Sequence, residues 1–158
     1  MDMRVWSPAF SDAESHEPPA RRVLVSMRDH ALRRIVANAL RHEGLEVVEA
    51  FDEESTREEL RRRAARPIDA VLVDARRYPE AAVEWLAELR ASDPTLALIA
   101  LATRAGDDLV ASARSHDAEV FQLPMTARDL RATLERAAHA SSWNMATRSE
   151  GVAGTTTS

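Results

Sequence analysis

The residues that could carry chemistry in this chain are of few kinds. Cysteine is absent, which excludes disulfides, thiolate catalysis and cysteine metal sites. All 21 basic residues are arginines, so no amine with an adjustable pKa is available to form a Schiff base. Histidines occur at five scattered positions, His16, His30, His42, His116 and His139, and no pair has the spacing of metal ligands. We therefore expect no metal site.

Larger catalytic motifs are missing as well. The chain has four glycines and contains no glycine-rich phosphate loop, nucleophile elbow or pair of catalytic carboxylates. Its net charge of −5, with both signs interleaved, argues against attraction to a phosphate backbone. These features predict a protein that is not an enzyme, holds no cofactor and does not bind nucleic acid.

Polar side chains of interest follow short apolar runs. They lie in Ser26–Asp29, at Asp74, in Ala102–Thr103 and in Gln122–Pro124. If the apolar runs are parallel strands, these positions meet at the carboxyl edge of one sheet, where ligands collect in open α/β folds. Function should be sought there.

The elements that would position these residues alternate between strand and helix patterns. Strands are predicted at Val23–Val25, Leu45–Ala50, Ile68–Val73, Leu96–Leu101 and Glu119–Leu123. The first predicted helix turns Leu32, Ile35, Val36, Ala39 and Leu40 inward and ends at Gly44. Asp52 is predicted to cap the second helix. The third helix is predicted at Glu80–Ala91, with Trp85 facing inward, and the fourth at Asp107–Ser115. Thr126–Asp129 is a capping box that opens the fifth helix. The pattern predicts an α/β fold, a (βα)5 doubly wound sheet of five parallel strands with the Ile68–Val73 strand central.

Both ends of the chain are too polar to join this core. Residues 1–20 and 141–158 are predicted to be disordered tails around one domain at 21–140, although Trp6 or Trp143 could contact a partner. The sequence has no apolar stretch of membrane-spanning length and no leader-like start. We expect a cytoplasmic protein without a membrane partner.

The segments Arg22–Val25, Ala31–Arg33, Gly44–Ala50 and Pro67–Asp74 together resemble the receiver domain of bacterial response regulators. The resemblance extends from Arg22 to about His139. It implies a flavodoxin-like sheet with strand order 2-1-3-4-5.

The resemblance also assigns roles to individual positions. Asp74 matches the aspartate that accepts a phosphoryl group from a histidine kinase. The two acidic residues that hold Mg²⁺ in the family are replaced here by Met27 and Arg28, and the conserved family lysine by Leu123. The family's hydroxyl residue falls on Ala102, its aromatic switch residue on Val120, and its cis proline on Pro124. Pro79 lies one residue later than the proline of the loop after the aspartate, which indicates an insertion in Ala75–Tyr78.

Two readings of Arg28 follow from these replacements. Its guanidinium either forms a bidentate pair with the Asp74 carboxylate in place of the metal, or extends into solvent. Asp29 either serves as a substitute ligand or caps the helix that begins at His30. Met27 and Leu123 are predicted to fill the former ion pocket with apolar atoms.

The function expected from this resemblance is that of a stand-alone, degenerate receiver in two-component signalling. It would act as a protein-interaction module without phosphorylation and would contact its partner, a histidine kinase or a second copy of the chain, through roughly Asp107–Ala140. The alternative is a working phosphorelay receiver, phosphorylated on Asp74 and dependent on Mg²⁺.

Overall fold

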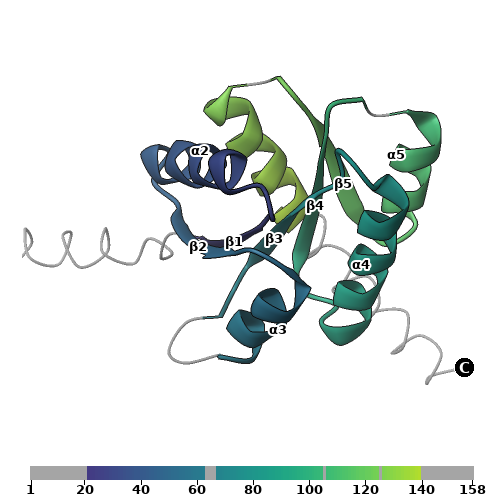
Figure 1. Ribbon diagram of the computed structural model, residues 1–158, viewed down its shortest axis with the longest axis horizontal. Coiled ribbons are helices and arrows are strands. Elements are labelled where there is room, and N and C mark those ends of the chain that lie inside the picture. The colour runs from purple at the N-terminus through teal and green to yellow at the C-terminus, as the bar shows by residue number, and fades with distance from the viewer. Residues whose placement is uncertain (1–20, 63–66, 105, 125, 140–158) are drawn as a thin grey trace, which may run out of the picture.

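The computed structural model describes residues 21–62, 67–104, 106–124 and 126–139 (Figure 1). The predicted tails, 1–20 and 141–158, lie outside the described residues, so the predicted domain limits stay a prediction.

Five strands and five helices alternate along the described chain. The strands are β1 (Arg22–Ser26), β2 (Glu46–Ala50), β3 (Ala70–Asp74), β4 (Ala97–Ala102) and β5 (Ala118–Gln122). The helices are α2 (His30–His42), α3 (Glu53–Arg61), α4 (Pro79–Ser92) and α5 (Asp107–Arg114), followed by a last helix over 127–139. Each predicted element is present, with ends that differ by at most two residues from the expected limits.

All five strands are parallel and lie in the order β2-β1-β3-β4-β5. This confirms the predicted fold class and the central position of β3. The order reverses between β1 and β3, because the chain leaves β1 for one edge of the sheet and later returns to the other side. Such a reversal opens a crevice at the carboxyl ends of the two strands.

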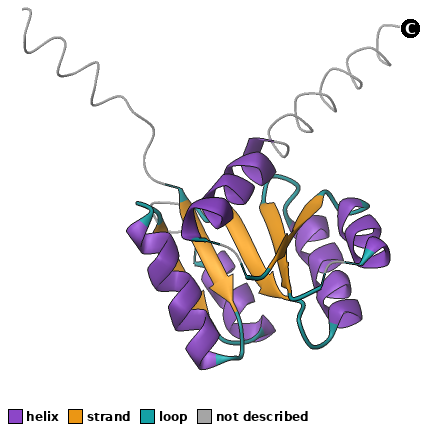
Figure 2. Ribbon diagram, turned by 90° about the horizontal axis from the view of Figure 1, so that it is seen from above, coloured by secondary structure: helices purple, strands orange, loops and turns teal. Residues whose placement is uncertain are grey.

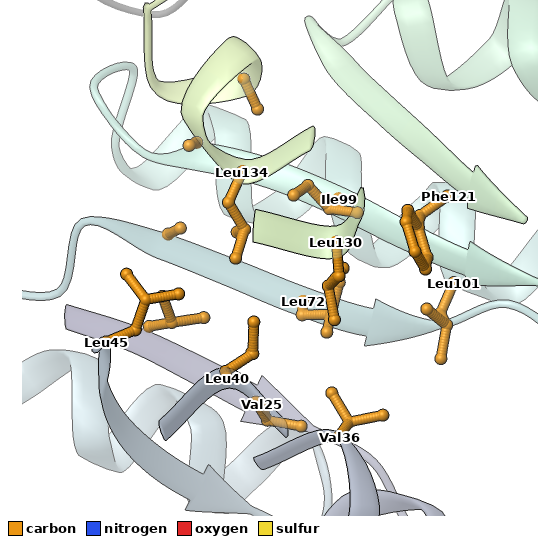
Figure 3. Close-up of a cluster of buried hydrophobic side chains, with 14 of the residues drawn as sticks. Val25, Val36, Leu40, Leu45, Leu72, Ile99, Leu101, Phe121, Leu130 and Leu134 are labelled. Atoms are coloured by element: carbon orange, nitrogen blue, oxygen red, sulfur yellow. The ribbon is translucent and has the colours of Figure 1, made fainter. Parts of the chain in front are cut away.

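Helices cover both faces of the sheet (Figures 1 and 2). The alternating side chains of each strand divide the core accordingly. Val25, Leu72 and Ile99 pack with α2 and the last helix on one face, where Leu40 and Leu134 are fully enclosed (Figure 3). Neighbouring strand residues face α3, α4 and α5 on the opposite side. Because β3 and β4 are covered on both faces, they read as continuous apolar runs in the sequence.

Local capping sets the helix ends that border the crevice. The Asp29 side chain accepts a hydrogen bond from the backbone N–H of Leu32 at the start of α2. Asp52 and Ser55 form a reciprocal capping box at the start of α3. Gly44 ends α2 with a φ of 86°, a conformation that glycine adopts without strain. The predicted capping roles of Asp29, Asp52 and Gly44 are thus confirmed.

The prediction is wrong for one core residue, Ile35. Ile35 is 65% exposed, whereas Val36, Ala37 and Leu40 are buried. A helix turns 100° per residue, so the buried stripe centred on Val36 and Leu40 leaves position 35 at the solvent side. Trp85 is buried on α4 as predicted. None of the described helices is long and apolar enough to cross a bilayer.

Candidate functional site

A cleft of about 640 Å³ opens at the carboxyl ends of β1, β2 and β3. It lies where the strand order reverses, as the sequence predicts for an α/β sheet. Its walls come from the turn after β1 (Ser26–Asp29), the turn after β2 (Phe51–Glu53), the end of β3 and its loop (Val73, Asp74, Arg76, Arg77, Tyr78), and α4 (Ala81, Ala82, Trp85).

Asp74 is the last residue of β3 and reaches this cleft with a side chain that is 20% exposed. Both of its carboxylate oxygens are engaged by Arg76, two residues later in the chain. The Nε of Arg76 donates to Oδ1 at 3.0 Å and Nη2 donates to Oδ2 at 2.9 Å. The backbone N–H of Arg76 also donates to Oδ1, at 3.0 Å. The pair is therefore bidentate and anchored by a tight turn of the backbone.

The same guanidinium reaches a second carboxylate. Nη2 of Arg76 donates to Oδ2 of Asp29 at 3.1 Å. The guanidinium therefore bridges Asp74 at the end of β3 and Asp29, the N-cap residue of α2. These hydrogen bonds raise the pKa of Arg76, with Asp74 as the largest cause. The backbone N–H of Leu32 and the side chain of Arg76 together lower the pKa of Asp29. One cation is shared by two anions in a partly buried site.

Arg28 does not take the place that one reading of the sequence gave it. Its side chain is exposed, and the carboxylate of Asp74 is occupied by Arg76 instead. The charge of Arg28 acts on Asp52, whose pKa is lowered mainly by hydrogen bonds from Ser55 and further by this arginine. Arg28 lies in the turn after β1, whereas Arg76 shares a tight turn with Asp74. The guanidinium of Arg76 therefore has the shorter distance to span to the Asp74 carboxylate.

The two apolar replacements are part of the core. Met27 is 2% exposed and belongs to the cluster between the sheet and α2, and Leu123 packs against the same cluster. The backbone carbonyl of Met27 accepts a hydrogen bond from Arg33 of α2, at 3.0 Å. The buried Met27 therefore fills space with carbon and sulfur, as predicted, whereas Leu123 is only partly buried and does not line the cleft.

The remaining predicted positions lie at the ends of β4 and β5. Ala102 is buried at the end of β4, and its carbonyl accepts the N–H of Leu123 at 2.8 Å. Val120 packs against the cluster on the other face of the sheet. The peptide bond between Leu123 and Pro124 is cis, which confirms that prediction. None of these residues lines the cleft.

The residues at this site do not fit the Mg²⁺ ion that the family resemblance implies. Mg²⁺ requires several oxygen ligands in near-octahedral geometry. Here one of the two family ligand positions holds a buried thioether, the other an exposed cation, and the Asp74 oxygens already accept three N–H groups. Within the described ranges, no group of three or more acidic, histidine or cysteine residues could hold a metal ion.

Two further polar contacts stabilise the cleft walls. The hydroxyl groups of Ser26 and Thr56 lie 2.6 Å apart, both buried, and tie the end of β1 to α3. Arg57 of α3 stacks over the ring of Trp85, with 4.8 Å between guanidinium carbon and ring centroid, while its Nε donates to Glu88 at 2.9 Å. The second contact joins α3 to α4 by a cation–π interaction.

Sequence reasoning missed Arg76. In the sequence, the loop Ala75–Tyr78 stands out only as the place of an insertion, which does not point to this arginine. An arginine two residues after a strand-end aspartate is a recognisable pattern, since the backbone turn that the aspartate caps brings both side chains to the same side.

Comparisons with known proteins agree with the architecture. No family model and no curated protein matches the sequence. Among solved structures, a response regulator from Thermotoga maritima is 22% identical with a TM-score of 0.67, covering 76% of this chain and 98% of its own. A CheY-like receiver domain protein from Methanospirillum hungatei is 19% identical with a TM-score of 0.63, covering 79% and 98%. NtrX from Brucella abortus is 24% identical with a TM-score of 0.69, covering 82% of this chain and 29% of that one. These similarities show that the chain has the response regulator receiver fold.

Proposed function

We propose that this chain is a degenerate receiver domain that works as a protein-interaction module in two-component signalling, without phosphorylation of Asp74. One observation carries the proposal, namely the bidentate pair of Arg76 with Asp74. A phosphoryl acceptor needs a free carboxylate oxygen and a cation that offsets the charge of the incoming group. Here the cation is a fixed part of the chain, and it occupies the oxygens that would react.

The receiver fold supports the proposed role in signalling, and the altered residues support the proposed absence of phosphorylation. With Met27 buried and Arg28 exposed, the positions that would hold a metal offer no carboxylate. A partner would then recognise the folded domain by binding to its surface. We place the contact surface at roughly Asp107–Ala140, whose described part comprises α5, β5 and the last helix.

A small phosphodonor tests the chemical half of this proposal. We expect that the full chain incubated with acetyl phosphate and Mg²⁺ gains no phosphoryl group by intact mass, like its Asp74→Asn variant. If the unmodified chain gains one phosphoryl group and Asp74→Asn gains none, the domain is a working phosphorelay receiver, and the proposal is wrong.

Affinity capture tests the interaction half. The full chain, Asp74→Asn and the surface variant Asp108→Arg/Arg114→Glu are immobilised and compared for proteins retained from the source cells. Asp108 and Arg114 are both exposed on α5. We expect Asp74→Asn to retain the same partner and the α5 variant to lose it. Loss of the partner in Asp74→Asn alone would contradict a phosphorylation-independent contact surface.

A further inference from the structure

Three aromatic rings line the cleft at the carboxyl edge of the sheet. Phe51, directly after β2, is 57% exposed, and Tyr78, directly before α4, is 70% exposed. The third ring is that of Trp85, which is buried on α4. Among the described residues, one further large hydrophobic side chain is exposed, Ile35 on α2, and it does not line the cleft. Because aromatic rings stack on other flat rings, this concentration favours a flat aromatic ligand.

The charged residues that line the cleft nearly balance. They comprise four carboxylates, Asp29, Asp52, Glu53 and Asp74, and three arginines, Arg28, Arg76 and Arg77. Every carboxylate already has a partner: Arg76 contacts two of them, the capping box of α3 holds the third, and an arginine of α3 lies beside the fourth. A charged ligand of either sign would meet like charges beside opposite ones. The cleft therefore matches a neutral molecule.

The indole of Trp85 provides a hydrogen-bond donor. The residue is only 6% exposed, and its Nε1–H has no acceptor within the part of the chain that the structure describes. A buried N–H of this kind has lost its hydrogen bond to water and gained none in the fold, which is unfavourable. A ligand that brings an acceptor would satisfy this donor.

The hydroxyl group of Ser26 provides an acceptor. The Thr56 hydroxyl lies 2.7 Å from the backbone carbonyl of Asp52, which can only accept, so Thr56 gives its single proton to that bond. In the 2.6 Å contact between the two hydroxyls, Ser26 is then the donor. Since its proton is used, the Oγ of Ser26 can only accept a hydrogen bond from a further group. Ser26 is 8% exposed and lines the cleft.

The donor and the acceptor lie along the same turn of α3. Ser26 contacts Thr56, and the ring of Trp85 contacts Arg57, the next residue of that helix. A ligand with an acceptor and a donor on adjacent atoms therefore suits the two groups. The volume of the cleft, about 640 Å³, is typical of sites for small molecules.

We propose that this cleft binds a neutral, flat aromatic molecule in which a carbonyl group lies next to an N–H or O–H group. The carbonyl accepts the Nε1–H of Trp85, the N–H or O–H donates to the Oγ of Ser26, and the rings contact Phe51 and Tyr78. The inference goes beyond the proposed function, because it gives the cleft a ligand of its own and needs neither a phosphorylation state nor a contact at α5.

A titration of the isotope-labelled full chain with a simple probe tests the proposal. The probe is 2-quinolone, a neutral two-ring lactam whose carbonyl group lies next to its N–H. We expect a saturable downfield shift of the Trp85 indole proton, because this proton gains an acceptor, with a dissociation constant of about 1 mM for so small a ligand. The chain has three tryptophans, and Trp85→Phe identifies the signal by its loss. The absence of a saturable shift overturns the proposal.

A charged probe of similar shape tests whether the ligand is neutral. Naphthalene-2-carboxylate keeps two flat rings and adds a negative charge. We expect it to cause no shift of the Trp85 indole proton at concentrations at which 2-quinolone saturates the site. Equal or tighter binding of the carboxylate would show that the arginines of the lining select the ligand, and the proposed ligand class would be wrong.

Substitutions at the rim test where the probe binds. Phe51 and Tyr78 are both exposed, so Phe51→Ser/Tyr78→Ser should retain the fold, as its amide spectrum checks. We expect 2-quinolone to bind this variant about tenfold more weakly. Ile35→Ser removes an exposed apolar side chain outside the cleft and should leave the affinity unchanged. Unchanged affinity of the rim variant, or equal weakening by both changes, overturns the proposal.

Ser26→Ala tests the acceptor separately from the rings. Thr56 keeps its hydrogen bond to the Asp52 carbonyl in this variant, so no proton is left without an acceptor. We expect 2-quinolone to bind roughly fivefold more weakly. N-methyl-2-quinolone has no N–H to donate, and it should bind Ser26→Ala and the unmodified chain equally. The same loss with both probes would contradict the hydrogen bond to Ser26.

Discussion

Arg76 binds both carboxylate oxygens of Asp74, at 3.0 and 2.9 Å, from a position only two residues later in the chain. The contact forms within one turn that the Asp74 side chain itself caps. The chain entropy lost in forming it is therefore small. A cation fixed in this way is part of the chain and lies beside the carboxylate without a metal ion.

A double-mutant cycle should detect this pair. Arg76→Met alone leaves a carboxylate that is only 20% exposed without its counterion, so it should cost more than Arg76→Met combined with Asp74→Asn. We expect a coupling energy of about 1–2 kcal/mol from urea unfolding.

Two other arginines serve as matched controls for the cycle. Arg77 is the next residue, and Arg28 is the residue that one of the two sequence interpretations paired with Asp74; both are exposed. Arg77→Met and Arg28→Met should each be additive with Asp74→Asn. If Arg28→Met instead couples to Asp74 and Arg76→Met does not, the pairing described above is wrong.

The charge of Asp29 should contribute to stability in a defined pH range. Its pKa is lowered by the N–H of Leu32 and by Arg76. A carboxyl group with a lowered pKa in the folded state stabilises the fold above its unfolded value, about pH 4 for aspartate, and this contribution is lost as the pH falls through the folded value. Asp29→Asn keeps a capping side chain but removes the charge. We expect the difference in unfolding free energy between the two proteins to be full at pH 7 and to shrink below about pH 4. A difference that does not change with pH would show that the charge of Asp29 is not coupled to folding.

Patterns with one dominant physical cause were predictable from the sequence. Continuous apolar runs identified β3 and β4, because strands covered on both faces have no polar side to display. An aspartate before a helical pattern has a local partner in the backbone, which predicts the cap at Asp52 and one of the two roles considered for Asp29.

The side-chain network of the cleft was less predictable. Arg28 follows β1 and Arg76 follows β3, so both stand near the strand ends where Asp74 lies. The conformation of the Ala75–Tyr78 loop brings the Arg76 guanidinium to the carboxylate. The choice depends on backbone dihedral angles that the sequence pattern does not report. Ile35 shows a second limit, because a residue at the edge of a helical stripe is assigned to the core or to solvent by small rotations of the helix.

Restoring a carboxylate at position 27 should destabilise the domain. Met27 is 2% exposed within the cluster between the sheet and α2. Met27→Asp places a charge inside this apolar cluster, and we expect a loss of about 3 kcal/mol or more. Met27→Leu conserves the apolar character and should cost less than about 1.5 kcal/mol. Similar costs for both variants in urea unfolding would mean that position 27 tolerates a hydrated carboxylate and is not part of the core.

Removing the side chain of Arg76 should create a weak cation site that the unmodified chain lacks. Oδ2 of Asp74 and Oδ2 of Asp29 accept hydrogen bonds from the same nitrogen, Nη2, at 2.9 and 3.1 Å, so both oxygens face one point. In Arg76→Ala two carboxylates repel each other there, and a hard divalent cation with oxygen ligands can replace the lost charge. We expect Mg²⁺ to stabilise Arg76→Ala in thermal unfolding with a roughly millimolar midpoint, and to leave the unmodified chain unchanged. Arg76→Ala/Asp29→Asn keeps only one of the two carboxylates, and it should lose the response. An equal response of the unmodified chain would show that Mg²⁺ competes with Arg76 for Asp74, and the arginine could then no longer be regarded as a permanent replacement for the metal.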